Sequence, residues 1–440
     1  MRRLLQPTLA FLFVALLSAA ASTPSSSWSE SRLERITGML QNGLDRELMV
    51  GGEALIWHDG KVVYRQQIGK RDHNDAEPLS PDAIYRIYSM TKPITSVGIM
   101  MLEEQGKLRL SDPLAAHLPE FANLRVFDSS AEATTDGEIP TAALVRPPTI
   151  EDVLAHKAGF TYGIFSFTPV DQAYIKAGLP AGLSNNPAIT LADYTQRLSQ
   201  IPLLHQPDTH WHYSVATDVL GRVIEVVSSQ TLADFFEQEI FQPLGMRDTS
   251  FTIAPDKAER LATLYSPEGL GAQFETKGMA AQRTGPGLEP ALDFFDAPYQ
   301  PGALFQSGGA GLLSTTDDYL KFSLMLLNEG ELEGTRLLAP STVRLMRSNF
   351  LSDQVTNSYI NGGTPREGRG FGLGFGTIED QALAATRQSE DSFYWSGAAG
   401  TTFWIDPDEN IIGIFMTQSI PHQTMLGQDF IQLTYQAYLR

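Results

Sequence analysis

Segments typical of β-strands lie at both ends of this 440-residue chain, and helical segments lie between them. Near the N-terminus, two runs of strand-forming residues within 52–69 flank Asp59-Gly60, which allows the positive φ angles of a tight hairpin turn. Near the C-terminus, the segments 368–380, 392–406 and 411–419 are predicted strands. The pattern predicts an α/β (α+β) fold, in which strands from both termini form one antiparallel sheet flanked by helices, with a mostly helical inserted lobe.

The length of the chain predicts two lobes, because single hydrophobic cores stop growing before 440 residues. We assign residues 28–110 and 300–440 to an α/β lobe and residues 111–299 to the mostly helical lobe. The three predicted C-terminal strands include a glycine-rich run, 370–376, which we interpret as one strand packed closely under another element. The sequence does not define the oligomeric state.

The first 21 residues resemble a signal peptide. Two arginines precede an apolar run from about Leu9 to Leu17, and three alanines then offer a small-residue cleavage site. A transmembrane anchor is the alternative, but the run is shorter than the roughly 20 apolar residues that a membrane span needs. The chain has no cysteine, so it has neither disulfides nor a lipid-anchored cysteine. We expect a periplasmic or secreted protein with no stable membrane anchor.

The charge balance excludes one class of partner. The chain has 51 Asp and Glu residues against 32 Lys and Arg, for a net charge of −19. A protein that neutralises nucleic-acid phosphates needs an excess of basic residues, so no nucleic-acid partner is expected. A solvated acidic surface is the simplest interpretation of the charge.

The tetrapeptide Ser89-Met90-Thr91-Lys92 stands where a helix is predicted to begin. The predicted helix places Ser89 and Lys92, three residues apart, on one face, and unpaired N–H groups at a helix start favour developing negative charge. A poorly solvated lysine loses its proton readily and could accept the proton of the Ser89 hydroxyl. The alternative interpretation is two polar residues that share one helical turn.

Two further segments offer the groups that such a nucleophile needs. Tyr213 precedes a predicted helix, and a phenol near cations can act as acid and base. The backbone N–H of Ala398 could join that of Ser89 in an oxyanion hole. Taken alone, Tyr213 and Trp395 are more simply explained as packed aromatic residues.

Other motifs do not lead to a site. The chain has no Gly-x-Ser-x-Gly, which a Ser-His-Asp hydrolase normally carries. His210 and His212 are spaced like metal ligands, but no further His or Cys cluster completes a zinc site. The glycine-rich run 370–376 lacks the Gly-Lys-Ser/Thr of a phosphate loop. We therefore expect neither a metal ion nor an organic cofactor.

Five segments in order resemble signatures of the serine β-lactamase-like superfamily, which includes class C β-lactamases, DD-peptidases and family VIII carboxylesterases. The resemblance covers about residues 35–435. It implies that Ser89 is the acylated nucleophile, Lys92 its base partner and Tyr213 the second acid/base, and that Trp395-Ser396-Gly397 replaces the Lys-Thr-Gly motif. The five segments are 85–121, 154–163, 210–225, 307–322 and 394–407.

Two departures from the β-lactamase pattern concern the substrate. The asparagine of the family's Tyr-x-Asn is Val215, and the lysine of Lys-Thr-Gly is Trp395. A lost charge-assisted contact is worth about 1.5–3 kcal/mol, which weakens binding of an anionic substrate roughly tenfold or more. Both changes resemble family VIII esterases and imply a neutral ester, with Trp395, Ser396, Gly397 and Val215 as the substrate-binding residues.

The expected function is therefore a secreted serine hydrolase that cleaves small carboxylic esters through an acyl-enzyme. Four alternatives remain open: a β-lactamase, a D-alanyl-D-alanine carboxypeptidase, a transacylase, and an inactive penicillin-recognition-type binding module. The sequence also leaves open whether Lys92 or Tyr213 is the base in each step, because two coupled groups titrate as a pair.

Overall fold

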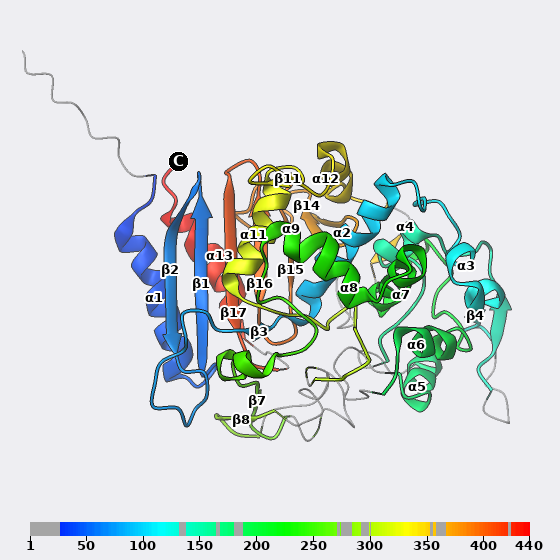
Figure 1. Cartoon of the computed structure of the whole chain (residues 1–440), viewed down its shortest axis with the longest axis horizontal. Coiled ribbons are helices and arrows are strands. Elements are labelled where there is room, and N and C mark those ends of the chain that lie inside the picture. Colours follow the sequence, from blue (N-terminus) through cyan, green and yellow to red (C-terminus); the bar gives the residue numbers. More distant parts are fainter. Residues whose placement is uncertain are drawn as a thin grey trace, which may run out of the picture.

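A seven-stranded antiparallel sheet is the centre of the fold (Figure 1). The computed structural model describes residues 27–131, 138–163, 168–179, 188–270, 273, 284–291, 299, 301–352, 355–357, 367–420 and 424–440. The strand order is β13-β14-β15-β16-β17-β1-β2, so the N-terminal hairpin joins the C-terminal strands through the β1–β17 pair. The predicted sheet from both chain ends is confirmed. The strands are β1 Gly51–His58, β2 Lys61–Gly69, β13 Arg369–Phe371, β14 Gly376–Ile378, β15 Phe393–Ser396, β16 Thr402–Asp406 and β17 Ile411–Thr417.

The turns of this sheet follow local chemistry. Asp59 and Gly60 have φ angles of 47° and 85°, as the β1–β2 hairpin turn requires. The glycine-rich run, in contrast, is not one strand: the chain reverses between β13 and β14. At Gly374 φ is 101°, and a Cβ atom built there would lie 2.2 Å from the Ser96 hydroxyl oxygen. Close packing was predicted correctly, but the single strand was wrong, because the glycines also allow a reversal.

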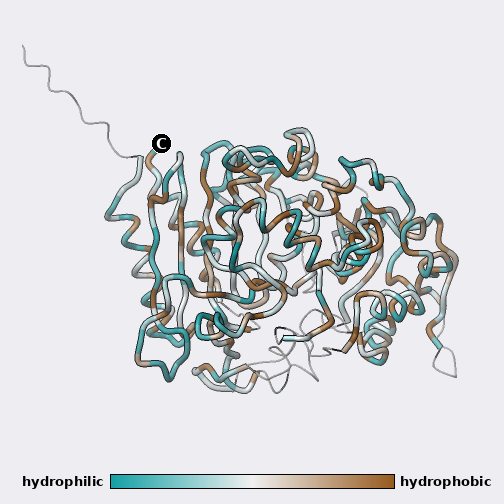
Figure 2. The backbone as a smooth tube through the Cα atoms, viewed as in Figure 1, coloured by the Kyte–Doolittle hydropathy of each residue, from teal (hydrophilic) through white to brown (hydrophobic). Residues whose placement is uncertain are grey.

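Helices cover both faces of the sheet. On one face lie α1 (Glu30–Asp45) and α13 (Leu426–Ala437), which pack on each other. On the other lies α11 (Thr316–Leu327), with α2 (Thr91–Glu104) and α7 (Ala216–Ser228) packed together beyond it. Side chains alternate along β1: Ala54 and Ile56 join the core under α1 and α13, and Leu55 joins the larger core. The loop after β2 is hydrophilic (Figure 2).

Five helices begin with the same sequence pattern, Thr-x-x-Asp. In each, the threonine side chain accepts a hydrogen bond from the backbone N–H of the aspartate three residues on. This satisfies an N–H group that has no partner within the helix, so the pattern fixes where each helix starts. The helices are α4 (Ile150–Leu154), α5 (Pro169–Lys176), α6 (Leu191–Leu198), α8 (Leu232–Phe236) and α11.

Short elements complete the fold. The other helices and helical turns are η1 Tyr88–Met90, α3 Leu114–His117, η2 Pro119–Asn123, η3 Glu237–Phe241, α9 Gln242–Leu244, η4 Pro255–Arg260 and α12 Pro340–Met346. The short strand pairs are β3 Tyr85–Arg86 with β9 Leu313–Ser314, β4 Arg125–Phe127 with β5 Thr141–Ala143, β6 His210–Trp211 with β12 Thr356–Asn357, β7 Tyr265–Pro267 with β8 Leu288–Pro290, and β10 Glu331–Leu332 with β11 Thr335–Arg336.

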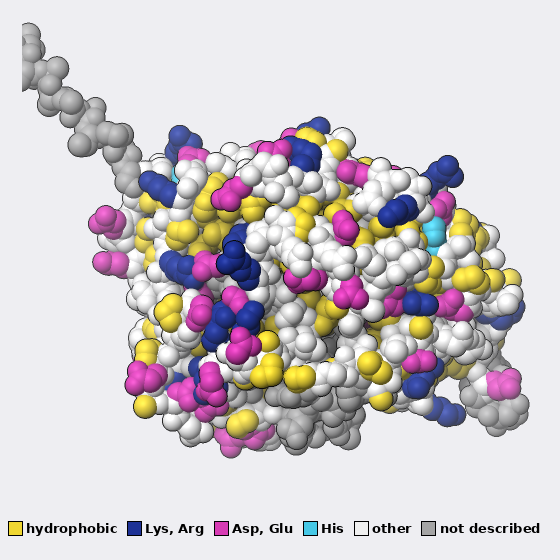
Figure 3. All heavy atoms as spheres, viewed as in Figure 1, with side chains coloured by type: hydrophobic (Ala, Val, Ile, Leu, Met, Phe, Trp, Pro, Cys, Tyr) yellow, Lys and Arg dark blue, Asp and Glu magenta, His cyan; other side chains and the backbone are white. Residues whose placement is uncertain are grey.

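Two predictions from the sequence stay untested by these elements. The lobe boundaries at 110 and 299 remain predictions, and the predicted signal peptide, 1–21, lies outside the described residues. Among the helices in the described ranges, none has both the length and the hydrophobicity to cross a membrane. On the face shown in Figure 3, acidic and basic side chains are interspersed.

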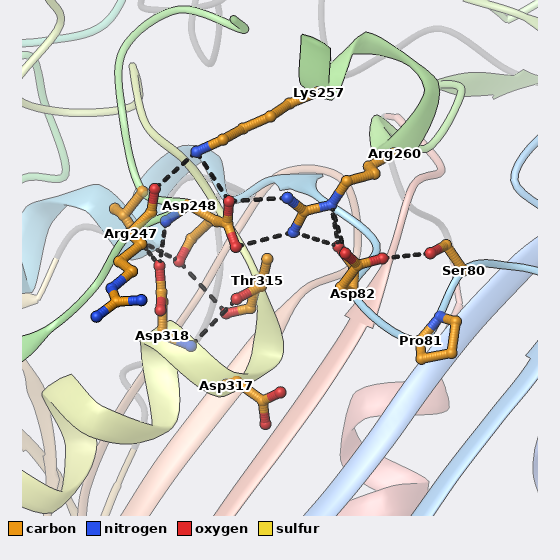
Figure 4. A network of polar contacts seen from close by, with 12 residues as sticks. Ser80, Pro81, Asp82, Arg247, Asp248, Lys257, Arg260, Thr315, Asp317 and Asp318 are labelled. Atoms are coloured by element: carbon orange, nitrogen blue, oxygen red, sulfur yellow. Dashed lines mark hydrogen bonds and ion pairs between the residues drawn. The ribbon is translucent and has the colours of Figure 1, made fainter.

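A network of ion pairs joins three distant segments beside α11 (Figure 4). Both terminal nitrogens of Arg260 donate to the Asp248 carboxylate, at 2.9 and 2.8 Å, and its Nε lies 2.9 Å from an oxygen of Asp82. Lys257 also contacts Asp248, at 2.9 Å. Hydrogen bonds from Arg260, followed by burial that acts in the opposite sense, leave the pKa of Asp248 at about 2. Arg260 on η4 thus bridges Asp248 and the loop after β2, and the N–H of Asp248 donates to Asp318 on α11.

Arg260→Ala is expected to lower the free energy of unfolding by about 1–2 kcal/mol, because it removes charge-assisted hydrogen bonds from a partly buried carboxylate. Since the pKa of Asp248 is depressed, its contribution is complete above its ordinary pKa and is lost as pH falls toward 2. Urea unfolding at pH 7 and pH 3 measures both effects. Arg247→Ala is the matched control, because the exposed Arg247 side chain points away from the network in Figure 4. Equal losses in the two variants would contradict the assignment.

Candidate active site

Ser89 lies on the 3₁₀ turn η1, directly before α2. Its neighbours Tyr88 and Met90 are fully buried, whereas Ser89 is partly exposed. Tyr88 has a φ of 43°, an unfavourable conformation for a bulky side chain that costs about 1–3 kcal/mol. Packing holds it: the Tyr88 ring meets the Tyr299 ring edge-on at 6.5 Å, and Tyr319 donates a 2.9 Å hydrogen bond to the Met90 carbonyl. Of the three residues of η1, Ser89 is therefore the one whose side chain reaches solvent.

Lys92, on the first turn of α2, points back at Ser89. Its Nζ lies 3.3 Å from Ser89 Oγ, 2.8 Å from the Tyr162 hydroxyl and 2.7 Å from the Gly309 carbonyl oxygen. The carbonyl only accepts, so one N–H of Lys92 always goes to Gly309. When the amine is neutral, its lone pair is left to face Ser89 or Tyr162. The structure brings the predicted nucleophile and its base partner together.

Burial lowers the pKa of Lys92, as a base partner of Ser89 requires. The side chain is fully buried, and the loss of solvation lowers the pKa of Lys92 to about 7, against a smaller opposing effect of the Asp218 carboxylate. A lysine with that pKa is neutral in a large fraction of molecules at neutral pH. It can therefore accept a proton from Ser89 without prior deprotonation by another group.

Two tyrosines, not one, surround Lys92. Its Nζ lies 4.7 Å from the ring centroid of Tyr213, the predicted second acid/base, and 5.4 Å from that of Tyr162. Burial raises the pKa of both phenols, and hydrogen-bonding neighbours that include Ser89 offset part of the rise at Tyr213. Both phenols are therefore neutral at pH 7. Tyr162 was missed: its segment, 154–163, was recognised, but nothing in the segment marks this tyrosine as a partner of Lys92.

The end of β15 approaches the nucleophile turn closely. A Cβ atom built at Gly397 would lie 2.3 Å from the Ile87 carbonyl oxygen, so only glycine allows this approach. The following residue, Ala398, packs against the cluster that contains Tyr88, and its backbone N–H has no hydrogen-bond partner among the described residues. This placement is compatible with the predicted oxyanion hole of Ser89 and Ala398, which stays a prediction.

The predicted substrate-binding residues differ in their surroundings. The partly exposed Trp395 ring lies 5.4 Å from the Tyr213 ring and 5.2 Å from the Phe371 ring. Ser396 is exposed. Val215, at the start of α7, is only 1% exposed and packs in the larger core, so the structure does not bring it to the open side of the site. The binding roles of Trp395, Ser396, Gly397 and Val215 stay predictions.

The histidines near Tyr213 show no metal site. His210 stacks on His205 with ring centroids 4.1 Å apart, and His212 contacts the Thr161 hydroxyl at 3.2 Å. In the part of the chain that the structure describes, no group of three or more His, Asp or Glu side chains is arranged to hold a metal ion. His156 is also buried, and its Nδ1 lies 3.1 Å from Ser214 Oγ.

The fold, with a partly exposed serine beside a buried lysine, is that of the serine hydrolases related to β-lactamases. Residues 36–431 match the family model Beta-lactamase, and the chain belongs to that family. An uncharacterised protein of Mycobacterium tuberculosis is 33% identical, over 86% of this chain and 88% of its own. Esterase EstB of Burkholderia gladioli is 28% identical, over 96% of this chain and 100% of its own.

A solved structure agrees with these relatives. EstCE1, described as a hydrolase with promiscuous acyltransferase activity, has 26% identity, covers 93% of this chain and 99% of its own, and superposes with a TM-score of 0.73. The predicted kinship with β-lactamase-like proteins and family VIII esterases is confirmed, and so is the prediction of an enzyme of the serine hydrolase class.

Proposed function

We propose that the protein hydrolyses small, neutral carboxylic esters through an acyl-enzyme on Ser89. The observation that carries this proposal is Trp395. It stands where a β-lactamase has a lysine, and its ring packs beside Tyr213, so the wall next to the nucleophile is aromatic and uncharged. An uncharged wall suits an ester and offers no partner to a carboxylate. The name of esterase EstB supports hydrolysis of the same kind of bond, and EstCE1 is described as a hydrolase.

In the proposed mechanism, Ser89 Oγ attacks the ester carbonyl carbon while its proton passes to the Lys92/Tyr213 pair. The backbone N–H groups of Ser89 and Ala398 would bind the negative charge that develops on the carbonyl oxygen. Tyr213 then protonates the leaving alcohol as the carbon–oxygen bond breaks, which leaves the acyl group on Ser89. Water attacks this acyl-enzyme, releases the acid and returns the proton to Ser89.

An alcohol in place of water would give acyl transfer. EstCE1 is a hydrolase with such an activity, and an apolar wall beside the acyl-enzyme would also hold an alcohol's carbon chain. Adding methanol to the ester assay and measuring methyl ester by mass spectrometry tests this second function. Free acid as the sole product would contradict it.

The leading proposal is tested with one purified preparation and two substrates. Short-chain nitrophenyl esters are expected to turn over rapidly, and a chromogenic cephalosporin slowly, because Trp395 stands where a β-lactamase has the lysine that meets its carboxylate. Rapid cephalosporin turnover with sluggish ester cleavage would favour the β-lactamase alternative. If neither substrate reacts and intact mass shows no acyl adduct, the inactive binding module would be the better description.

The pH dependence of ester hydrolysis should follow Lys92. The pKa of Lys92 is about 7, and only the neutral amine accepts the Ser89 proton, so kcat/KM should fall tenfold per unit as pH drops below about 7. Initial rates between pH 5 and 9 measure this acid limb. A kcat/KM that stays constant down to pH 5 would contradict this prediction, because it would show that protonation of Lys92 does not slow the reaction.

We also propose that residues 1–21 are a cleaved signal peptide and that the enzyme is exported to the periplasm or beyond. Arg2, Arg3 and the apolar run that follows support this proposal. Expression of the whole chain in a bacterium, followed by fractionation and intact mass, tests it. A cytoplasmic protein that keeps its first residues would contradict export.

A further inference from the structure

A second buried charge lies next to Lys92. Asp218, on α7 and five residues after Tyr213, is completely buried. One of its oxygens, Oδ1, accepts hydrogen bonds from the Ser307 hydroxyl and from the Gly309 N–H, the latter at 3.1 Å. Its Oδ2 has no hydrogen-bond partner among the described residues. A carboxylate without exposure to water is costly unless an opposite charge compensates it.

The loop of Ser307, Gly308 and Gly309 connects Asp218 to Lys92. Gly309 donates its N–H to Asp218 and accepts from Lys92 Nζ through its carbonyl oxygen, at 2.7 Å. A Cβ atom at Gly309 would lie 2.7 Å from Asp218 Oδ2, and one at Gly308 would lie 2.7 Å from the Thr217 carbonyl oxygen. The loop therefore reaches α7 only because both residues are glycines.

The charges around this pair are few. The pKa of Asp218 is raised by burial and lowered, to a smaller extent, by Lys92. Among the described residues, titratable groups that also interact with Lys92 or Asp218 are Tyr213, Tyr162, Tyr194 on α6 and His156, two residues after α4. The helices α3 and α8, which also pack on α7, bury only apolar side chains. Among the described residues, Lys92 is thus the cation that acts on Asp218.

We propose that Asp218 is a positioning residue that holds Lys92 in place through the loop 307–309 and balances its charge, without touching the substrate. The inference rests on the proposed function in that Lys92 is taken as the base. The negative charge of Asp218 stabilises the ammonium form of Lys92, which burial destabilises. That form is needed after each proton transfer from Ser89 or water.

The first test is the pH profile of two variants. Asp218→Asn keeps the shape and removes the charge, so the acid limb of ester hydrolysis should move to lower pH by about one unit, because the protonated amine loses its counter-charge. Ser307→Ala removes a hydrogen bond to Asp218 but leaves its charge, so its acid limb should move less than that of Asp218→Asn. An Asp218→Asn limb that does not move, or that moves to higher pH, overturns the proposal.

The second test needs no turnover, so it separates this inference from the proposed function. In the unmodified enzyme, Asp218→Asn should lower the melting temperature, because Lys92 loses its counter-charge. In a Lys92→Met background the same change should lower it much less or raise it, because it then removes a buried charge without a partner. Equal shifts in both backgrounds overturn the proposal. If Asp218→Asn alone does not fold, recovery of folding in the double variant gives the same expected result, and no recovery overturns it.

Discussion

Ser89→Ala is expected to lower kcat/KM for nitrophenyl ester hydrolysis by at least about a thousandfold, because no acyl-enzyme can form without the hydroxyl. The Lys92 amine would remain, but it loses only its 3.3 Å contact and keeps those to Tyr162 and Gly309. Since the Ser89 side chain is partly exposed, the melting temperature should change little. A loss of activity with unchanged stability assigns the effect to chemistry.

Ser348→Ala is the matched control for this experiment. Ser348 is exposed two residues after α12, and its hydroxyl donates to the Arg344 carbonyl in the last turn of that helix. Its activity should equal that of the unmodified enzyme. Intact mass after a brief reaction with substrate should show an acyl adduct in the Ser348→Ala protein and none in the Ser89→Ala protein. Undiminished hydrolysis in the Ser89→Ala protein would exclude Ser89 as the nucleophile.

The parts of the fold that could be predicted from the sequence are those that local chemistry determines. Asp59-Gly60 specifies a hairpin turn, and the C-terminal strand formers specify strands, so the sheet built from both ends follows. The glycine-rich run shows the limit of this reasoning. Glycines that allow close packing also allow a reversal, and the close approach of Gly374 to Ser96, far away in sequence, cannot be derived from the run itself.

In the candidate site, too, some residues could be predicted from local sequence and others depend on contacts between distant elements. Ser89 and Lys92 are three residues apart on one turn, so their proximity follows from helix geometry. Tyr162 and Asp218 could not be found in this way, because their relation to Lys92 depends on contacts between separate elements. Lys92 meets Tyr162 across 70 positions and Gly309 across 217. In the sequence, Asp218 is one polar residue in a helix, and its significance comes only from complete burial.

These contacts explain why an ordinary lysine can serve as a base here. Burial lowers the pKa of Lys92 and the Asp218 charge opposes this effect, while the ammonium form can donate to Ser89, Tyr162 and Gly309. Burial has the larger effect and leaves the pKa of Lys92 at about 7, close to neutral pH, where a proton carrier works best. The strained backbone at Tyr88 and the glycine at 397 also shape the site, because they bring Ser89 and the end of β15 together.

The two phenols beside Lys92 should therefore have different effects when each is changed to phenylalanine. Tyr213→Phe is expected to lower kcat/KM for ester hydrolysis by about a hundredfold to a thousandfold, because it removes a group that protonates the leaving alcohol. Its acid limb should stay in place, because a phenylalanine ring still faces the Lys92 ammonium. The measurement is the full pH profile of hydrolysis of an alkyl ester, because an alkoxide needs a proton to leave whereas nitrophenolate does not.

Tyr162→Phe is the variant with which the activity and the acid limb of Tyr213→Phe should be compared. It removes an oxygen that accepts a hydrogen bond from Lys92 at 2.8 Å, so the ammonium is less stable and the acid limb should move to lower pH, with a loss of only about tenfold at the optimum. An apolar ring fits both sites equally, so a purely structural role would give similar losses and unmoved limbs. If the larger loss falls on Tyr162→Phe, the acid that serves the leaving alcohol is Tyr162, and Tyr213 is the residue that positions the lysine.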